Sequence, residues 1–390
     1  MPNTLAALWI FLQLLVGFNL VFPFVLYCIY KISKKKEATF LPLNNKPDYA
    51  VIITAYQYIN TLPDVVTSAL KLNYNNYLIY VVADNCDVSS LHFSDERVVL
   101  LRPPEVLRGN TKSHFYAIHN FKRDHEIITI IDSDNLVDPE YLNQLNTSFN
   151  LGFDAVQGIR EAKNLDTTYA CLDAARDIYY HFFDCKVLFN AGSSSTLSGS
   201  GMAFRTQLYK DCLENKEIQG AGFDKVLQAA IVGKNKRIAF SEAAIVYDEK
   251  TSKPAELVNQ RSRWINTWFK YFRLGFVLIA RSIRIFSLNQ FLFGLVLLRP
   301  PLFVFLILGL LFLTVNIFIH PLAALLWLCG FLVFTGCFIT SLLSSHTDKR
   351  IYKSLYGIPK FMFYQLISLT KIFKANKRSV ATQHFHVNKN

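Results

Sequence analysis

The sequence has 390 residues, of which 52% are hydrophobic and 18% are charged, and its formal net charge is +12. This composition is too apolar for an ordinary soluble protein and too charged for a bundle made only of membrane helices, so the apolar residues must be concentrated in parts of the chain. The seven cysteines form no CxxC pair, which argues against a zinc ribbon or a thioredoxin-like site and fits a reducing compartment.

The first predicted element is a membrane-spanning helix. Residues 5–30 carry no charge, and at about 1.5 Å per residue a helix of this length crosses a bilayer. A signal peptide would need a basic start, whereas here the basic run KISKKK follows the apolar stretch at 31–36. The positive-inside rule then places Lys31 onward in the cytoplasm. We therefore predict that residues 1–31 form an N-terminal transmembrane helix of a multi-pass protein of the cell (inner) membrane.

A soluble α/β domain is predicted over residues 48–253, in the cytoplasm. Short β-branched runs that end in polar residues occur at 49–54, 77–84, 97–102 and 126–132, and residues 62–72 between the first two have helical spacing. Such runs indicate a parallel sheet covered by helices on both faces, that is, a Rossmann-like fold. Ligands of these sheets bind at the carboxyl ends of the strands, where Asp84 and Asp132 stand.

The rest of the chain is predicted to return to the membrane. Residues 254–298 form amphipathic interfacial helices, residues 300–345 a transmembrane hairpin broken at His320, and residues 346–390 an interfacial helix with a basic cytoplasmic tail. The basic clusters flank apolar segments, which favours a membrane surface as the partner. No basic stripe interleaved with stacking aromatic residues occurs in the polar middle, so no nucleic-acid partner is predicted.

Two carboxylates one residue apart, Asp132 and Asp134, follow the strand predicted at 126–132. Carboxylate oxygens on a loop suit Mg²⁺ or Mn²⁺, which keep several waters and bridge to the phosphates of a substrate. The alternative is a solvated loop in which Asp134 caps a following helix. The position at a strand end leaves both interpretations open.

Three further features are each ambiguous when taken alone. Asp84 could hydrogen-bond a nucleobase or ribose, or form an Asx-turn. Lys112, near the start of a predicted helix, could meet a phosphate or remain solvated. The loop at 195–205 contains two glycines that would allow close approach of a ligand, or it is a plain turn. Neither GxGxxG after the first strand nor a P-loop occurs, which argues against a dinucleotide oxidoreductase or an NTPase.

The motif QRSRW at 260–264 lies on a predicted helix. Gln260, Arg263 and Trp264 share one face of that helix, because they stand at positions i, i+3 and i+4. A guanidinium group binds diphosphate oxygens in a bidentate manner, and an indole ring stacks on a sugar. The alternative is an interfacial helix anchored by its Arg and Trp.

Taken in order, these motifs resemble the processive-type family 2 glycosyltransferases, which join a GT-A catalytic domain to membrane helices and include cellulose, hyaluronan and poly-N-acetylglucosamine synthases and ceramide glucosyltransferases. The family pattern is an Asp after the second strand, a DxD motif, a later catalytic Asp and Q/RxxRW. In this chain the pattern corresponds to Asp84, to Asp132 with Asp134, to Asp224 in GFDKVL, and to QRSRW. The resemblance covers roughly residues 48–345 and implies a GT-A fold with transmembrane and interfacial helices.

The resemblance implies an inverting, metal-dependent hexosyltransferase that moves a sugar from a nucleotide-sugar, a UDP-sugar, to a lipid or glycan acceptor at the cytoplasmic membrane face, in cell-surface polysaccharide or glycolipid synthesis. By this resemblance, Asp224 is expected to be the catalytic base, and Asp134 and Asp132 are expected to bind a Mg²⁺ or Mn²⁺ ion. The implied donor-binding residues are Thr54, Tyr56, Asp84, Lys112 and Asp132, and the residues for the diphosphate and acceptor are Gln260, Arg263 and Trp264.

Two departures from the family pattern keep a second function open. The segment TAYQYI at 54–59 lacks an acidic residue, and Asp224 lacks a neighbouring Glu, so that Glu217 and Glu242 are alternative bases. The alternative function is a catalytically inactive membrane scaffold or partner subunit of a glycan-synthesis complex. Three predicted spans are also few for a polymer tunnel unless subunits associate as a homo-oligomer or with an accessory subunit, which favours transfer to a lipid or a short acceptor.

Overall fold

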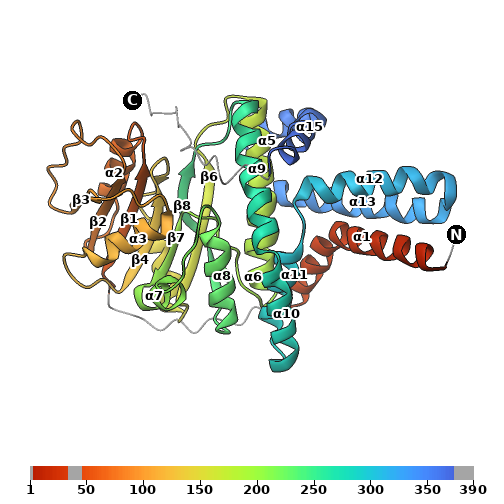
Figure 1. The fold of residues 1–390 in the computed structure, drawn as a ribbon, viewed down its shortest axis with the longest axis horizontal. Coiled ribbons are helices and arrows are strands. Elements are labelled where there is room, and N and C mark those ends of the chain that lie inside the picture. The colour runs from red at the N-terminus through yellow and green to blue at the C-terminus, as the bar shows by residue number, and fades with distance from the viewer. Residues whose placement is uncertain (1–2, 34–45, 373–390) are drawn as a thin grey trace.

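In the computed structural model of the protein, residues 3–33 and 46–372 are described, and they form a sheet domain from which three long helices extend (Figure 1). Residues 34–36 of the predicted basic run and residues 373–390 of the predicted basic tail lie outside the described residues. Between the sheet domain and the long helices lie shorter helices that run across the base of the long ones. The molecule is therefore divided into an α/β part and a helical part.

The sheet has eight strands in the order β3-β2-β1-β4-β7-β6-β8-β5. The four strands predicted from the sequence are β1 (Tyr49–Tyr56), β2 (Tyr77–Asp84), β3 (Val98–Leu101) and β4 (Ile127–Asp132), and they are parallel as predicted. The others are β5 (Leu136–Val137), β6 (Ala155–Ala162), β7 (Met202–Arg205) and β8 (Ile238–Asp248). Because β7 is antiparallel to both β4 and β6, and β6 is parallel to β8, the carboxyl ends of β1, β2, β4, β6 and β8 meet at one edge.

Helices cover both faces of the sheet because alternate strand residues point to opposite sides. Ile128 and Ile130 of β4 belong to a core with α3 (Asn110–His119), α7 (Thr206–Leu213) and α8 (Phe223–Gly233). Ile127 and Ile131 belong to a second core with α2 (Leu62–Leu70) and α4 (Tyr141–Asn150). Each fully buried isoleucine side chain stabilises the fold by roughly 1.5–3 kcal/mol. Two apolar cores therefore fix the strands whose ends carry the candidate residues.

The pairing of β6 with β8 contains an irregularity. Gly158 pairs with Ser241, whereas the next residue, Ile159, pairs with Ile245, so residues 242–244 of β8 have no counterpart in β6. A Cβ atom on Gly158 would lie 2.4 Å from the carbonyl oxygen of Ala244, which leaves room only for glycine. This β-bulge bends β8 just before its carboxyl end.

A π-helix links the sheet domain to the long helices. Helix α5 (Thr168–Tyr180) continues into the π-helix η1 (His181–Val187) and then α6 (Leu188–Asn190). In η1, Asp184 forms a buried ion pair with Arg299, which follows α11 (Leu288–Leu298). Stretches of π-helix are rare and frequently occur at functional sites. Here the π-helix fixes the segment that leads into the hairpin.

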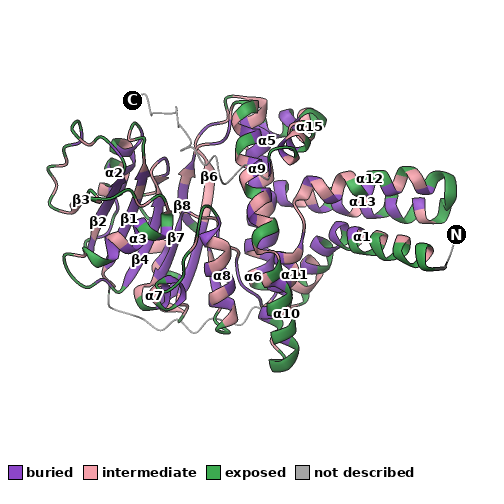
Figure 2. Ribbon diagram, in the orientation of Figure 1, coloured by how far each residue is buried: buried purple, intermediate pink, exposed green. Residues whose placement is uncertain are grey.

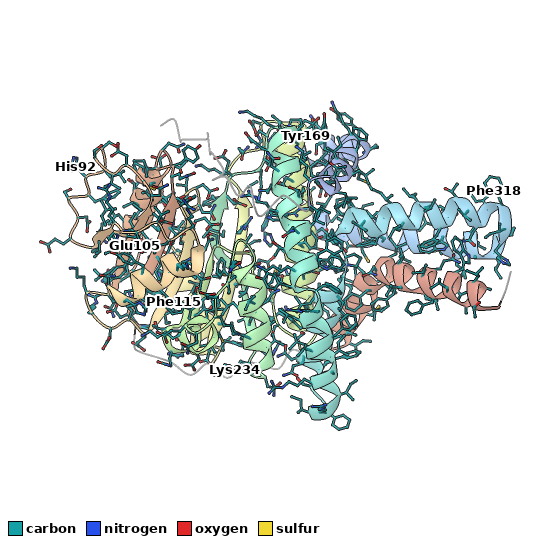
Figure 3. The ribbon with its side chains drawn as sticks, viewed as in Figure 1. His92, Glu105, Phe115, Tyr169, Lys234 and Phe318 are labelled. Atoms are coloured by element: carbon teal, nitrogen blue, oxygen red, sulfur yellow. The ribbon has the colours of Figure 1, made fainter. Side chains whose placement is uncertain are left out.

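Within the described residues, three helices are long and apolar enough to cross a membrane. They are α1 (Asn3–Ile32), α12 (Leu302–Ile319) and α13 (Pro321–Leu343), and they lie side by side with many exposed residues (Figure 2). Large apolar side chains are among these exposed residues. The Gln13 side-chain oxygen accepts hydrogen bonds from Asn316 at 2.6 Å and from Trp327 at 2.8 Å, which join all three helices. Phe318 marks the end of the hairpin furthest from the sheet (Figure 3).

The remaining helices lie between these two parts. The segment predicted as amphipathic forms α9 (Pro254–Tyr271) and α10 (Arg273–Ile285), followed by α11, and the C-terminal segment forms α14 (Lys349–Ser354), η2 (Leu355–Gly357) and α15 (Ile358–Leu369). Helix α10 buries Gly275, Leu278 and Ser282, whereas Phe276, Ile283 and three arginines are exposed on the other side. Its amphipathic pattern is that of a helix at a surface. The predicted domain boundaries remain a prediction.

Candidate active site

The loop that carries Asp132 and Asp134 is held from two sides at the carboxyl edge of the sheet. The backbone N–H of Asp132 donates to the Ser200 hydroxyl at 3.0 Å, and Ser200 belongs to the glycine-containing loop before β7. The Thr61 hydroxyl donates to the carbonyl oxygen of Ser133 at 2.7 Å. Asp134 is buried, and Asp132 is partly buried. These bonds place the two carboxylates at the ligand-binding edge predicted from the sequence.

Asp84, at the end of β2, holds a neighbouring loop. Its two carboxylate oxygens each accept a backbone N–H, from Leu107 and from Arg108, both at 2.9 Å. The loop leads into α3, where Lys112 is exposed in the first turn. Residues 85–87 and 102–106 line a cavity of about 560 Å³ beside this contact. Asp84 therefore shapes one wall of the cavity through the loop.

Strand pairing brings most of the predicted donor-binding residues together. Thr54 of β1 pairs with Asp132 of β4. Tyr56, two residues after Thr54, pairs with Asp84 of β2. Adjacent strands of a sheet lie about 4.8 Å apart, so these four residues form one continuous row. The row ends at the loop that leads to Lys112.

Asp224 lies in the first turn of α8. Its carboxylate is 3.4 Å from the Lys225 ammonium group, and its side chain is 18% exposed. The preceding Gly222 has a left-handed backbone, with φ of 105°, and packs against Thr267 and Tyr271 of α9. The positive end of the α8 dipole favours a carboxylate at this position. Asp224 is thus set beside the helix that carries QRSRW.

The two alternative bases lie elsewhere. Glu242 is one of the three residues of the β8 bulge, and it pairs with Lys186 at 2.7 Å. Glu217 lies in the loop before α8, where it lines a cavity of about 400 Å³ together with Lys270 and Tyr271 of α9. Asp224 is the acid of the three that stands at a helix N-terminus.

The QRSRW residues lie on α9 as predicted, but the indole ring of Trp264 already has partners. The guanidinium carbons of Arg261 and Arg176 lie 4.0 Å and 4.4 Å from the ring centroid, which is cation–π geometry. Trp264 remains 37% exposed. Gln260 accepts a hydrogen bond from the Thr251 hydroxyl at 3.3 Å, and burial lowers the pKa of Arg263.

A set of charged residues that the sequence reasoning missed joins the sheet edge to α9. We call it the ionic network, and it comprises Arg160, Asp173, Arg176, Asp177, Asp248, Lys250 and Arg261. At the sheet edge, Arg160 lies 2.6 Å from Asp248, and the Lys250 ammonium group lies 3.0 Å from Asp248 and 2.6 Å from Asp177. Asn135, next to Asp134, also donates to Asp248 at 3.3 Å.

The ionic network continues to Trp264 through α5. Asp177 pairs with Arg176, and Asp173 pairs with Arg261 and lies 3.6 Å from Arg176. Although burial raises the pKa of a carboxyl group, Lys250 and Arg176 hold the pKa of Asp177 well below its usual value. Although burial lowers the pKa of an amine, Asp177 raises the pKa of Lys250. The network is therefore charged, and each charge depends on its partners.

The donor set at the sheet edge fits a magnesium or manganese ion. The described residues contain no group of three or more His, Cys, Asp and Glu side chains that could hold a metal on its own. Mg²⁺ is typically bound by one or two carboxylates, with water and substrate phosphates completing its coordination. Asp132 and Asp134 supply such a pair, at an edge that also has room for a ligand.

Comparison with known proteins gives one family and many structural relatives, including the following two. Residues 47–267 match the profile of a family described as Glycosyltransferase like family 2. The fold is similar to that of a mannosyltransferase from Pyrobaculum calidifontis in complex with GDP-Man and Mn²⁺, at 13% identity and a TM-score of 0.53, over 94% of this chain and 98% of that one. It is less similar to S. aureus TarS 1–349 in complex with UDP-GlcNAc, at 14% identity and a TM-score of 0.43, over 85% and 90%. No curated protein matches the sequence.

Proposed function

The chain belongs to the glycosyltransferase-like family 2, whose profile matches more than half of it, and we propose that it transfers a sugar from a nucleotide-sugar to a lipid or glycan acceptor at a membrane face. The predicted GT-A fold is confirmed. The observation that supports the activity best is the row of Thr54, Asp132, Tyr56 and Asp84 at one edge of the sheet. The choice among polysaccharide and glycolipid synthases remains a prediction.

In the proposed donor complex, the base and ribose lie near Tyr56 and the cavity beside Asp84, and the diphosphate lies near Lys112. Asp134 and Asp132 would hold Mg²⁺ or Mn²⁺, which when bound would neutralise the charge of the departing nucleoside diphosphate. The P. calidifontis relative was solved with GDP-Man and Mn²⁺. A UDP-sugar remains our proposed donor, and a GDP-sugar is tested beside it because that relative was solved with GDP-Man.

We propose that Asp224 takes the proton from the hydroxyl group of the acceptor while the oxygen of that hydroxyl attacks the anomeric carbon of the donor sugar. The bond between this carbon and the diphosphate breaks in the same step, and the configuration of the carbon is inverted. A general base acts within about 3 Å of the oxygen that it deprotonates. The partial exposure of Asp224 at the start of α8 suits this role. Gln260, Arg263 and Trp264 of α9 would then bind the diphosphate and the acceptor sugar.

The proposed acceptor approaches laterally from the cytoplasmic leaflet. Phe286, which follows α10, is 94% exposed and has a left-handed backbone with φ of 51°, and exposed Arg281 and Arg284 precede it. An exposed apolar flank beside basic side chains fits a helix that lies in the headgroup region. Because α9 continues directly into α10, this arrangement would hold QRSRW at the membrane surface.

The test is release of nucleoside diphosphate by purified protein from UDP-sugars and GDP-mannose, with Mg²⁺ or Mn²⁺. We expect turnover with at least one donor, and loss of about 10²-fold or more in Asp134→Ala and Asp224→Asn, because each removes a group that acts on the transition state. Asp211→Asn, an exposed acid of α7, should behave like wild type. No release from any donor by the wild type would favour the inactive scaffold or partner subunit.

A further inference from the structure

We propose that Arg160 is a positioning residue that makes the binding of the divalent cation and of the nucleoside diphosphate depend on each other, and that the ionic network carries the change to Trp264. This inference rests on the proposed function, because it concerns the same cation and diphosphate. It assigns a role to a residue of β6 that belongs to none of the motifs in the sequence.

Arg160 contacts both segments that flank Asp132 and Asp134. One of its terminal nitrogens donates to the carbonyl oxygen of Ser198 at 2.6 Å, and the loop of Ser198 holds the backbone of Asp132 through Ser200. The other donates at 2.6 Å to Asp248, which also accepts a hydrogen bond from the side chain of Asn135. Any shift of the guanidinium group therefore affects the loop on both sides of the two carboxylates.

The charges around Arg160 do not balance within the ionic network. The network holds four cationic side chains and three carboxylates, so it carries one excess positive charge. Burial alone would lower the pKa of Arg160, yet its pKa is raised by four surrounding carboxylates. These carboxylates belong to Asp248, Asp177, Asp132 and Asp134. Two of these four carboxylates are the proposed metal ligands, so the positive charge of Arg160 acts on the same groups that would hold the metal ion.

This arrangement has opposite effects on the two ligands. A divalent cation that arrives alone adds two positive charges close to a buried guanidinium group, and in a buried site that repulsion is poorly screened. A nucleoside diphosphate that arrives with the cation contributes negative charge and removes the repulsion. Each ligand should therefore bind more tightly in the presence of the other, and Arg160 should add to the coupling that the direct attraction between the cation and the phosphates already provides.

The ionic network connects Asp248, the partner of Arg160, to Trp264 of α9, so a change at Arg160 on ligand binding can affect α9. Asp248 shares Lys250 with Asp177, and the arginines that pair with Asp177 and Asp173 both lie on the indole ring of Trp264. Lys250 and Arg261 are 2% and 3% exposed, so solvent screens these contacts little. A displacement of Asp248 should therefore alter the surroundings of Trp264, which tryptophan fluorescence detects.

The experiment measures Mn²⁺ binding by the loss of the free-ion EPR signal, with and without UDP or GDP. We expect the nucleotide to tighten Mn²⁺ binding about tenfold in the wild type, which is within the usual range of coupling between two ligands. In Arg160→Gln, Mn²⁺ alone should bind about tenfold more tightly, and the nucleotide should tighten Mn²⁺ binding less than it does in the wild type, because only the direct attraction between the cation and the phosphates is left. Arg160→Lys should restore the coupling, and Arg205→Gln, which disrupts an ion pair with Asp154 at the opposite edge, should behave like the wild type.

Fluorescence provides the second measurement. Mn²⁺ with UDP or GDP should change the emission of the wild type but not that of Trp264→Phe, and the change should shrink in Arg160→Gln. If Arg160→Gln keeps the wild-type Mn²⁺ affinity and nucleotide effect, the inference is wrong while the proposed function stands. If Asp134→Ala binds Mn²⁺ with nucleotide as well as the wild type does, the proposed metal site itself fails.

Discussion

Gly222 lies so close to Thr267 that a Cβ atom at position 222 would stand 2.5 Å from the Thr267 methyl carbon. The added Cβ atom would also lie 2.7 Å from a ring carbon of Tyr271. This contact sets the first turn of α8, with Asp224, against α9. It also requires a glycine at position 222, because the packing leaves no room for a side chain there.

Replacement of Gly222 by alanine should therefore separate α8 from α9. We expect Gly222→Ala to lower kcat for sugar transfer by at least about tenfold, since misplacement of a catalytic group by 1 Å can cost about 10²-fold. The matched control is Gly152→Ala, because Gly152 also has a positive φ, 84°, but a Cβ atom added there would have no neighbour within 4 Å. It should lose only about 1 kcal/mol of stability and keep its activity. Equal kcat values in the two variants would contradict this account.

The two hydrogen bonds of Asp84 lead to a prediction about the loop before α3. Asp84→Asn turns one acceptor oxygen into a donor that faces a backbone N–H, which should cost about 1–3 kcal/mol. We expect faster hydrogen exchange at Leu107 and Arg108 and about tenfold weaker binding of UDP or GDP. Asp95→Asn serves as the control, because Asp95 also accepts a backbone N–H, from Arg97 at 2.9 Å, but lies before β3 at the other end of the strand. Unchanged exchange at Leu107 in Asp84→Asn would exclude the role assigned to this carboxylate.

The buried ion pair of Arg299 and Asp184 should matter as a pair. Removal of one partner, as in Arg299→Met, leaves an uncompensated buried charge and should destabilise the protein by about 3–5 kcal/mol. Arg299→Met combined with Asp184→Leu removes both charges and should recover most of the melting temperature in detergent. Additive losses in the double variant would show that the two residues do not act together.

His114 leads to a prediction about acid stability. Its side chain is fully buried, its Nδ1 atom lies 2.7 Å from the Tyr209 hydroxyl, and burial lowers its pKa to about 3. On acidification, His114 therefore takes up a proton in the unfolded chain at a higher pH than in the folded protein. The free energy of unfolding should fall as the pH drops below about 6.5 and go on falling to about pH 3, by about 1.4 kcal/mol per pH unit. The slope of melting temperature against pH should flatten in His114→Gln. In His119→Gln, which changes an exposed residue of the same helix, the slope should not flatten.

Local patterns in the sequence predicted the first four strands and the motifs, but not the ion pairs between residues far apart in the chain. The runs at 49–54 and 126–132 form adjacent parallel strands in the sheet. This follows from their composition, because a continuous apolar, β-branched run is typical of a strand that is buried on both faces of an α/β sheet. Lys250 and Asp177 are far apart in the sequence and follow no local period, so no window of sequence could pair them. Asp248 is the one residue of the ionic network that a sequence pattern could have indicated, because it ends a strand as Asp84 does.

The three extra residues of β8 have a consequence for changes in chain length. In a strand, side chains alternate between faces, so an odd number of unpaired residues reverses which face the following residues occupy. Arg160 pairs with Val246, which places Asp248, two residues on, on the same face. Deletion of residues between Ser241 and Ile245 that keeps the pairing on both sides would leave Asp248 where it is. If residues 242–244 instead paired regularly with β6, Asp248 would move three positions along the strand and face away from Arg160. In homologous chains, an acid at the end of this strand should therefore accompany a bulge at this point, whatever the number of residues in the bulge.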